Sequence, residues 1–141
     1  MEAGSMVHAL EQIHDLLEPE GYLIDIHPNG ELDEFIYPLD EREQFVGYLQ
    51  ETDDYIEYRQ ADEAIQTVIS RGLFQVLRAG GFEFRTYADS MDELKNFLEE
   101  IWSDALISND VIANARRLEK EFGKRKTFLR ERAKINLLRA L

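Results

Sequence analysis

Apolar residues recur along this chain with two different periods, and each change of period marks a predicted element. From Ser5, the expected N-cap, they follow helical spacing until the sequence PEG at 19–21 stops the helix. The next residues, YLIDIH at 22–27, form a nearly continuous apolar run, which is typical of a strand that helices cover on both faces. The sequence PNG at 28–30 then predicts a turn.

The middle of the chain predicts a hairpin followed by a helix. Residues 31–37 and 43–49 each mix apolar with charged side chains, and the Pro-Leu-Asp sequence at 38–40 supplies a connection between two strands. Thr52 or Asp53 is expected to begin the helix, because apolar residues after this point return to helical spacing.

A second alternating region and two more helices follow. Residues 73–87 alternate as a strand does, and the glycines at 80–81 predict either a β-bulge or a hairpin turn. The S-x-x-E sequence at 90–93 has the pattern of a capping box, which predicts the start of a helix. Asn109 is expected to cap another helix, which Gly123 ends.

The last segment, residues 126–141, fits two structures. Its content of Arg, Lys, Leu and Ala favours a helix, because these residues are good helix formers. The same residues also alternate, so that two sets of side chains would lie on opposite faces of a strand. The pattern alone leaves both structures open.

The helix–turn–strand sequence ALEQIHDLLEPEGYLIDIHP at 9–28 resembles the late part of class I S-adenosylmethionine-dependent methyltransferases. In that family a helix leads through an LkPGG turn into the fifth strand of a parallel sheet, and here Glu20 replaces the first of the two glycines. Residues 72–94 resemble the long antiparallel strand and the helix that follow the family's last crossover. The resemblance therefore implies that residues 126–141 form the antiparallel partner of that strand.

The features with which this family binds its cofactor are missing from the chain. The family holds S-adenosylmethionine with a glycine-rich loop after the first strand and an acidic residue after the second, and the glycines here never form G-x-G-x-x-G. The resemblance therefore implies the C-terminal half of a methyltransferase-like protein. No cofactor is expected in this chain alone, and S-adenosylmethionine would bind only if a partner supplied the missing half. The start, MEAGSM, fits both a native start and a cloning scar.

We therefore expect residues 1–141 to form a single domain of the α/β or α+β class, with helices packed on a mixed sheet. Its strands should include a buried one at 22–27 and long antiparallel ones near 73–87 and 126–141. Without the first half of the fold, the strand at 22–27 would have a bare apolar edge, and a second copy or another partner chain would cover it, most simply in a two-fold homodimer. Two functions remain: a methyltransferase-like domain without independent catalysis, or a non-enzymatic homodimeric binding or structural protein.

Charge and composition narrow the choice of partners. The net charge of −13 disfavours nucleic acid and anionic membranes. The chain has no apolar run long enough for a membrane helix, no signal-peptide pattern and no cysteine, so the cytoplasm is the expected location. Residues 1–64 contain 18 acidic side chains, whereas residues 115–141 contain ten basic ones. The two ends either lie together and neutralise each other, or they mediate self-association, or the basic end forms a binding patch.

Two residues are the candidate substrate-binding residues, and no catalytic residue is assigned. His27 closes the predicted strand at its carboxyl end, where ligands bind to open α/β sheets, and histidine can act as a base near neutral pH. Asp25 interrupts the apolar run and needs a partner if it is buried. The alternatives are a histidine beside a turn and an acid that caps a neighbouring backbone. The acidic pairs Asp33-Glu34 and Asp53-Asp54 could hold a hard cation, but a solvated surface is the simpler interpretation.

Overall fold

The computed structural model describes residues 3–51 and 56–141. Within these residues the chain has four helices and six strands, and every strand pair with an assigned register is antiparallel. The expected combination of packed helices with long antiparallel strands is confirmed, but the expected mixed sheet is not, because none of these registered pairs is parallel. The chain divides into two compact units: unit 1 contains residues 3–31, 56–82 and 132–141, and unit 2 contains residues 32–51 and 83–131.

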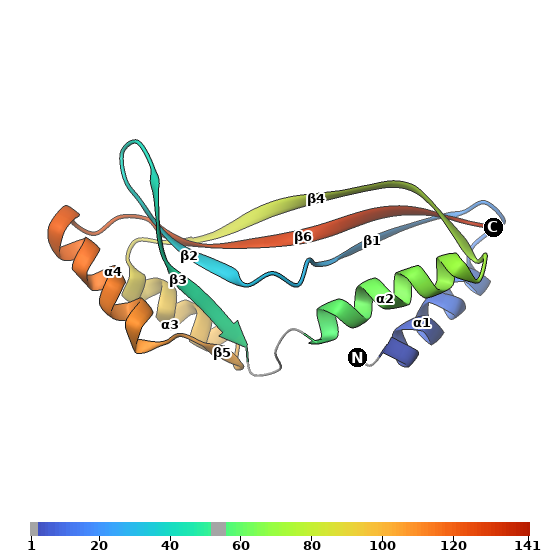
Figure 1. Cartoon of the computed structure of the whole chain (residues 1–141), viewed down its shortest axis with the longest axis horizontal. Coiled ribbons are helices and arrows are strands. Elements are labelled where there is room, and N and C mark those ends of the chain that lie inside the picture. The colour runs from blue at the N-terminus through green and yellow to red at the C-terminus, as the bar shows by residue number, and fades with distance from the viewer. Residues whose placement is uncertain (1–2, 52–55) are drawn as a thin grey trace. The chain divides into compact units, whose positions relative to one another are not determined.

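Unit 1 is a layer of three strands with two helices packed on one face (Figure 1). Its elements are α1 (Ala3–Leu16), β1 (Tyr22–Pro28), α2 (Ile56–Ser70), the first part of β4 (Phe74–Ala88) and the last part of β6 (Thr127–Ala140). In unit 1, β6 pairs with β1 and β4. The core between helices and strands combines Ile65 and Val68 of α2 with Phe74 and Leu138, and α1 adds Leu10.

The two faces of β1 differ in burial. In the register of β1 with β6, Tyr22 lies opposite Arg139, and the pairing continues without a shift to the end of β1. Burial alternates along β1, and the side chains of Tyr22, Ile24 and Ile26 face away from the helices, 63%, 62% and 56% exposed. The prediction that helices cover both faces of this strand is therefore wrong. The apolar run concealed the alternation, because the inner face carries polar residues whose partners lie far away in the sequence.

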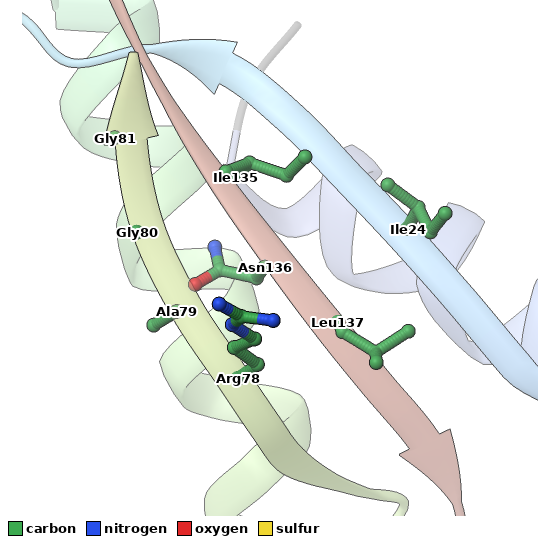
Figure 2. A pocket seen from close by; sticks show the side chains of 8 residues that line it. All are labelled: Ile24, Arg78, Ala79, Gly80, Gly81, Ile135, Asn136 and Leu137. Atoms are coloured by element: carbon green, nitrogen blue, oxygen red, sulfur yellow. The ribbon is translucent and has the colours of Figure 1, made fainter.

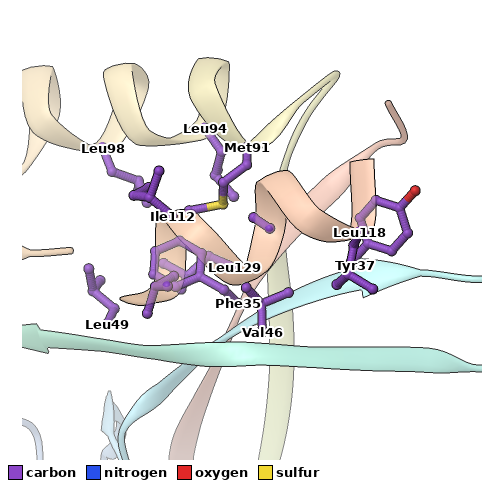
Figure 3. Packing of buried hydrophobic residues seen from close by; sticks show 12 residues of the cluster. Phe35, Tyr37, Val46, Leu49, Met91, Leu94, Leu98, Ile112, Leu118 and Leu129 are labelled. Atoms are coloured by element: carbon purple, nitrogen blue, oxygen red, sulfur yellow. The ribbon is translucent and has the colours of Figure 1, made fainter. Parts of the chain in front are cut away.

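Unit 2 is a second layer of strands with two helices of its own. β2 (Asp33–Pro38) and β3 (Glu43–Glu51) form the predicted hairpin, with a β-bulge between Phe35 and Ile36. The first part of β6 pairs with β2, and the short β5 (Ala105–Leu106) pairs with β3. Side chains from these strands meet those of α3 (Met91–Ile101) and α4 (Asn109–Phe122) in one apolar core (Figure 3).

Helix starts were predicted with mixed success. α1 already includes Ser5, so this residue is not its N-cap. Ser90 caps α3 by accepting a hydrogen bond from the backbone N–H of Glu93, as the capping box predicted. α4 is capped by Ser108 rather than Asn109, because Ser108 has the extended backbone that a cap requires. The predicted helix start at 52–53 lies outside the described residues.

The two long strands follow the predicted pattern. The glycines at 80–81 lie inside the continuous strand β4, which excludes the hairpin turn that was one alternative there. The segment 126–141, for which a helix and a strand were both open, is the strand β6. No helix in the described ranges is long and apolar enough to cross a membrane.

Candidate functional site

The two predicted site residues lie together on the inner face of β1, because side chains two positions apart point to the same side of a strand. Asp25 is opposite Asn136 of β6, and His27 is opposite Lys134. α2 places the carboxylate of Asp62 beside the His27 ring. These five polar side chains from three elements of unit 1 are called the His27 cluster below.

His27 is hydrogen-bonded at both ring nitrogens. Its Nδ1 lies 2.9 Å from Oδ2 of Asp25, and its Nε2 lies 2.7 Å from Oδ1 of Asp62. The His27 side chain is buried, with only 8% exposed. Ionised carboxylates only accept hydrogen bonds, so both ring nitrogens donate and the imidazole is the doubly protonated cation.

Each of the two carboxylates has a second partner. The side-chain amide of Asn136 donates to Oδ2 of Asp25 at 2.9 Å, and Nζ of Lys134 donates to Oδ2 of Asp62 at 2.6 Å. The His27 cluster therefore contains two anions and two cations, and its net charge is zero. Partly buried charges are tolerated when they are paired and hydrogen-bonded in this way.

These contacts shift three pKa values in the directions that keep the cluster charged. The hydrogen bond to Asp25 raises the pKa of His27 above its ordinary 6.5, and the bond to Asp62 adds to this against the opposing effect of burial. Burial alone would raise the pKa of Asp25, but hydrogen bonds from His27 and Asn136 outweigh it and hold this pKa below 3.8. Against the same effect of burial, Lys134 and His27 lower the pKa of Asp62.

This arrangement leaves His27 without a free ring nitrogen. A general base needs an unprotonated nitrogen within reach of its substrate, and a metal ligand needs a lone pair. In the part of the chain that the structure describes, no group of three or more His, Asp or Glu side chains is arranged to hold a metal ion. The His27 cluster is therefore a network of ion pairs and hydrogen bonds that links β1, β6 and α2. A substrate would reach the imidazole only by displacing a carboxylate.

Sequence reasoning found Asp25 and His27 but missed the other three members of the cluster. Lys134 and Asn136 are two positions apart on one face of β6, so the alternation of the predicted strand was a usable signal. Asp62 gave no such signal, because nothing in the sequence places this part of α2 beside β1.

A second polar cluster, in unit 2, covers the face of β2 and β6 that points away from α3 and α4. Arg130 donates to Glu34 at 3.2 Å and to Glu43 at 2.8 Å. The guanidinium of Arg85 lies 4.6 Å from the ring centroid of Phe128, which is only 2% exposed. Charged side chains thus cover the apolar layer on this face.

The predicted neutralisation between the acidic and basic ends of the chain is confirmed within each unit. Such ion pairs are Lys134–Asp62 and Arg132–Glu31 in unit 1, and Arg125–Asp40 and Arg130–Glu34 in unit 2. Glu34, one of the acids considered as a cation ligand, is therefore paired with an arginine. The other acidic pair, at 53–54, lies outside the described residues.

The outer face of β1 and β6 in unit 1 is apolar and open. Ile24 lies opposite Leu137, and Ile26 lies opposite Ile135. Figure 2 shows the hollow that these strands form with residues 78–81 of β4. Because Ile24 and His27 point to opposite faces of β1, the His27 ring does not line this hollow.

No model of a known protein family matches this chain, and no curated protein matches its sequence. The methyltransferase resemblance of residues 9–28 accordingly stays a prediction from sequence. The geometry offers two features from which a function can be argued: the closed His27 cluster on the inner face of β1, and the apolar outer face of the same strand.

Proposed function

We propose that this chain is a non-enzymatic binding protein that acts as a dimer of identical subunits joined through β1 of unit 1. The observation that carries this proposal is the exposure of Tyr22, Ile24 and Ile26 on the outer face of β1. Each of these side chains stands to gain about 1 kcal/mol from burial of its remaining exposed surface. That gain favours association over an isolated subunit.

The position of β1 at the edge of its sheet supports the same proposal. Among the described strands, β1 pairs with β6 alone. Edge strands usually carry charged side chains, proline or a bulge that prevents pairing with another chain. The charged residues of β1, Asp25 and His27, both point inward, and Pro28 prevents pairing only at the end of the strand. The other strand that pairs with β6 alone, β4, carries three charged side chains along its length: Arg78, Glu83 and Arg85.

Two further observations favour binding over catalysis. The imidazole of His27 donates both of its protons to carboxylates, so it lacks the free nitrogen of a general base. The hollow beside Ile24 is lined by apolar side chains, the β4 segment 78–81 and Asn136, and the His27 ring is not part of this lining. These features suit a protein that holds a partner rather than one that transforms a substrate.

The proposal is tested by light scattering on the wild-type chain and on two matched lysine variants. Ile24→Lys places a charge on the exposed face of β1, whereas Ile101→Lys does so on α3 at an equally exposed position (62% and 61%). We expect a dimer for the wild type and for Ile101→Lys, and a monomer for Ile24→Lys. Circular dichroism should show the same secondary structure for all three proteins.

Two results would overturn the proposal. The first is a wild-type chain that stays monomeric at about 100 µM, because even weak specific protein interfaces are populated at that concentration. The second is calorimetric binding of S-adenosylmethionine at about micromolar concentration, a binding free energy near −8 kcal/mol, which would favour the methyltransferase-like function instead.

A further inference from the structure

The hydrogen bonds at the two ends of β1 determine which of its backbone groups face β6. The carbonyl of Gly21 accepts from the N–H of Ala140 at 2.8 Å, and the N–H of Asn29 donates to the carbonyl of Arg132 at 3.1 Å. The register of β1 runs between these two pairs without a shift. In an antiparallel ladder, hydrogen-bonded pairs alternate with pairs that are not hydrogen-bonded. Odd-numbered residues of β1 therefore direct their backbone groups toward β6.

The even-numbered residues direct their backbone groups toward the free edge. Tyr22, Ile24 and Ile26 thus combine two properties: their side chains lie on the outer face, and their N–H and C=O groups point away from β6. Pro28 has no N–H and cannot donate at this edge. The edge available for pairing consists of three consecutive even-numbered residues centred on Ile24.

We infer that two copies pair antiparallel through β1 about a two-fold axis at Ile24. Ile24 then lies opposite Ile24 of the partner subunit, and Tyr22 lies opposite Ile26 of the partner subunit. This register rests on the proposed dimer and specifies its geometry. In this register the edge-facing backbone groups of Tyr22, Ile24 and Ile26 in each copy all form hydrogen bonds to the other copy. The register also joins the outer faces of the two subunits into one continuous apolar surface.

Other registers with the same backbone parity are less favourable. A shift by two residues in one direction places Asp25 directly opposite Asp25 of the partner subunit, and like charges in that position are destabilising. A shift in the other direction leaves Ile26 beyond the end of the partner's strand. The register centred on Ile24 avoids both costs because it sets Asp25 opposite Leu23 of the partner subunit.

The charge distribution permits this pairing although each copy carries a net charge of −13. The acid within β1, Asp25, points inward and is hydrogen-bonded to His27 and Asn136. Beside Tyr22 the neighbouring strand presents a basic residue, Arg139. The paired edge therefore brings no unpaired like charges together, and repulsion between the more distant acids is screened by salt.

Single-cysteine variants test the register directly, because the natural chain has no cysteine. Opposite residues of a hydrogen-bonded antiparallel pair have Cα atoms about 5.5 Å apart, within the range that a disulfide bridges. Ile24→Cys should therefore form a disulfide dimer on mild oxidation. Tyr22→Cys and Ile26→Cys should each stay unlinked alone, since like positions are then about 13 Å apart. An equimolar mixture of these two variants should cross-link.

The controls separate failure of the register from failure of the dimer. Ala113→Cys, at an exposed position on α4, measures the background from random collision. One result would overturn the register but not the dimer. Light scattering would show a dimer, Ile24→Cys alone would stay at background, and a mixture of Ile24→Cys with either Ile26→Cys or Tyr22→Cys would cross-link. A monomer by light scattering with no cross-linking above background would overturn both.

Discussion

Replacing His27 with glutamine removes one of the two cations from the His27 cluster. Asp25 and Asp62 then retain only Asn136 and Lys134 as side-chain partners. Breaking a fully buried ion pair costs about 3–5 kcal/mol. The side chains of the two acids that lose this cation, Asp25 and Asp62, are 19% and 38% exposed, so solvent screens part of this loss. We expect the free energy of unfolding to fall by about 2 kcal/mol at neutral pH.

The pH dependence of this loss has a defined sign. The folded-state pKa of His27 is raised above 6.5, so the stability that its charge supplies is complete below 6.5 and disappears as the pH rises through the folded value. The folded-state pKa values of Asp25 and Asp62 are lowered, so their contribution is complete above 3.8 and disappears as the pH falls through those values. The difference between wild type and His27→Gln should therefore be largest between about pH 4 and pH 6.5.

The assay is urea unfolding followed by circular dichroism at a series of pH values from about 4 to 9. Circular dichroism is preferred because the single tryptophan, Trp102, lies in unit 2 and reports on its own surroundings. His8→Gln is the matched control, because His8 lies on α1 with its side chain 69% exposed, and it should change stability by less than about 0.5 kcal/mol. Parallel stability curves for wild type and His27→Gln between about pH 6 and 9 would refute this account of the cluster.

Two further predictions concern unit 2. Gly47→Ala should destabilise the protein by about 1–3 kcal/mol in thermal unfolding, because a Cβ at this position would overlap Cγ2 of Val111. The control is Gly4→Ala, which should be neutral or stabilising because no atom lies near its Cβ. Arg130→Leu should cost about 1–3 kcal/mol, because it leaves Glu34 without this ion pair beside an apolar layer. Chemical denaturation at low and high salt checks the second prediction, and a variant as stable as the wild type would contradict it.

Much of the fold was predictable because its signals are local. The hairpin of β2 and β3 follows from two segments of mixed apolar and charged residues around a turn sequence, and the Ser90 cap follows from a pattern of four residues. The strand β6 required more, because its composition favours a helix, its alternation fits a strand equally well, and only the family resemblance implied the strand. Pairing with β1 and β2 determines its structure, and those partners lie about a hundred positions away in the sequence.

The candidate site was only half predictable for the same reason. Asp25 and His27 share one strand face, so the sequence indicates them as a pair. Asp62 and Lys134 come from α2 and β6, and only the folded chain brings them to the histidine. Without these partners His27 fits a general base, and with them it is a cation whose two protons are already bound. The chemical role of a histidine depends on its hydrogen-bond acceptors, which the local sequence does not specify.

The inner and outer faces of β1 are linked through the register of the strand. A slip of one residue would turn Asp25 and His27 toward solvent and bring Tyr22, Ile24 and Ile26 to the helix-covered face. Apolar side chains alone would oppose such a slip only weakly, because the inner face also carries an apolar residue, Leu23, and the two faces would then differ little. The hydrogen bonds of His27 to Asp25 and Asp62 are satisfied in one register only, so they specify which residues face outward. The charged cluster on the inner face therefore holds the register that presents the apolar edge on the outer face, and under the proposed function it supports binding in this way.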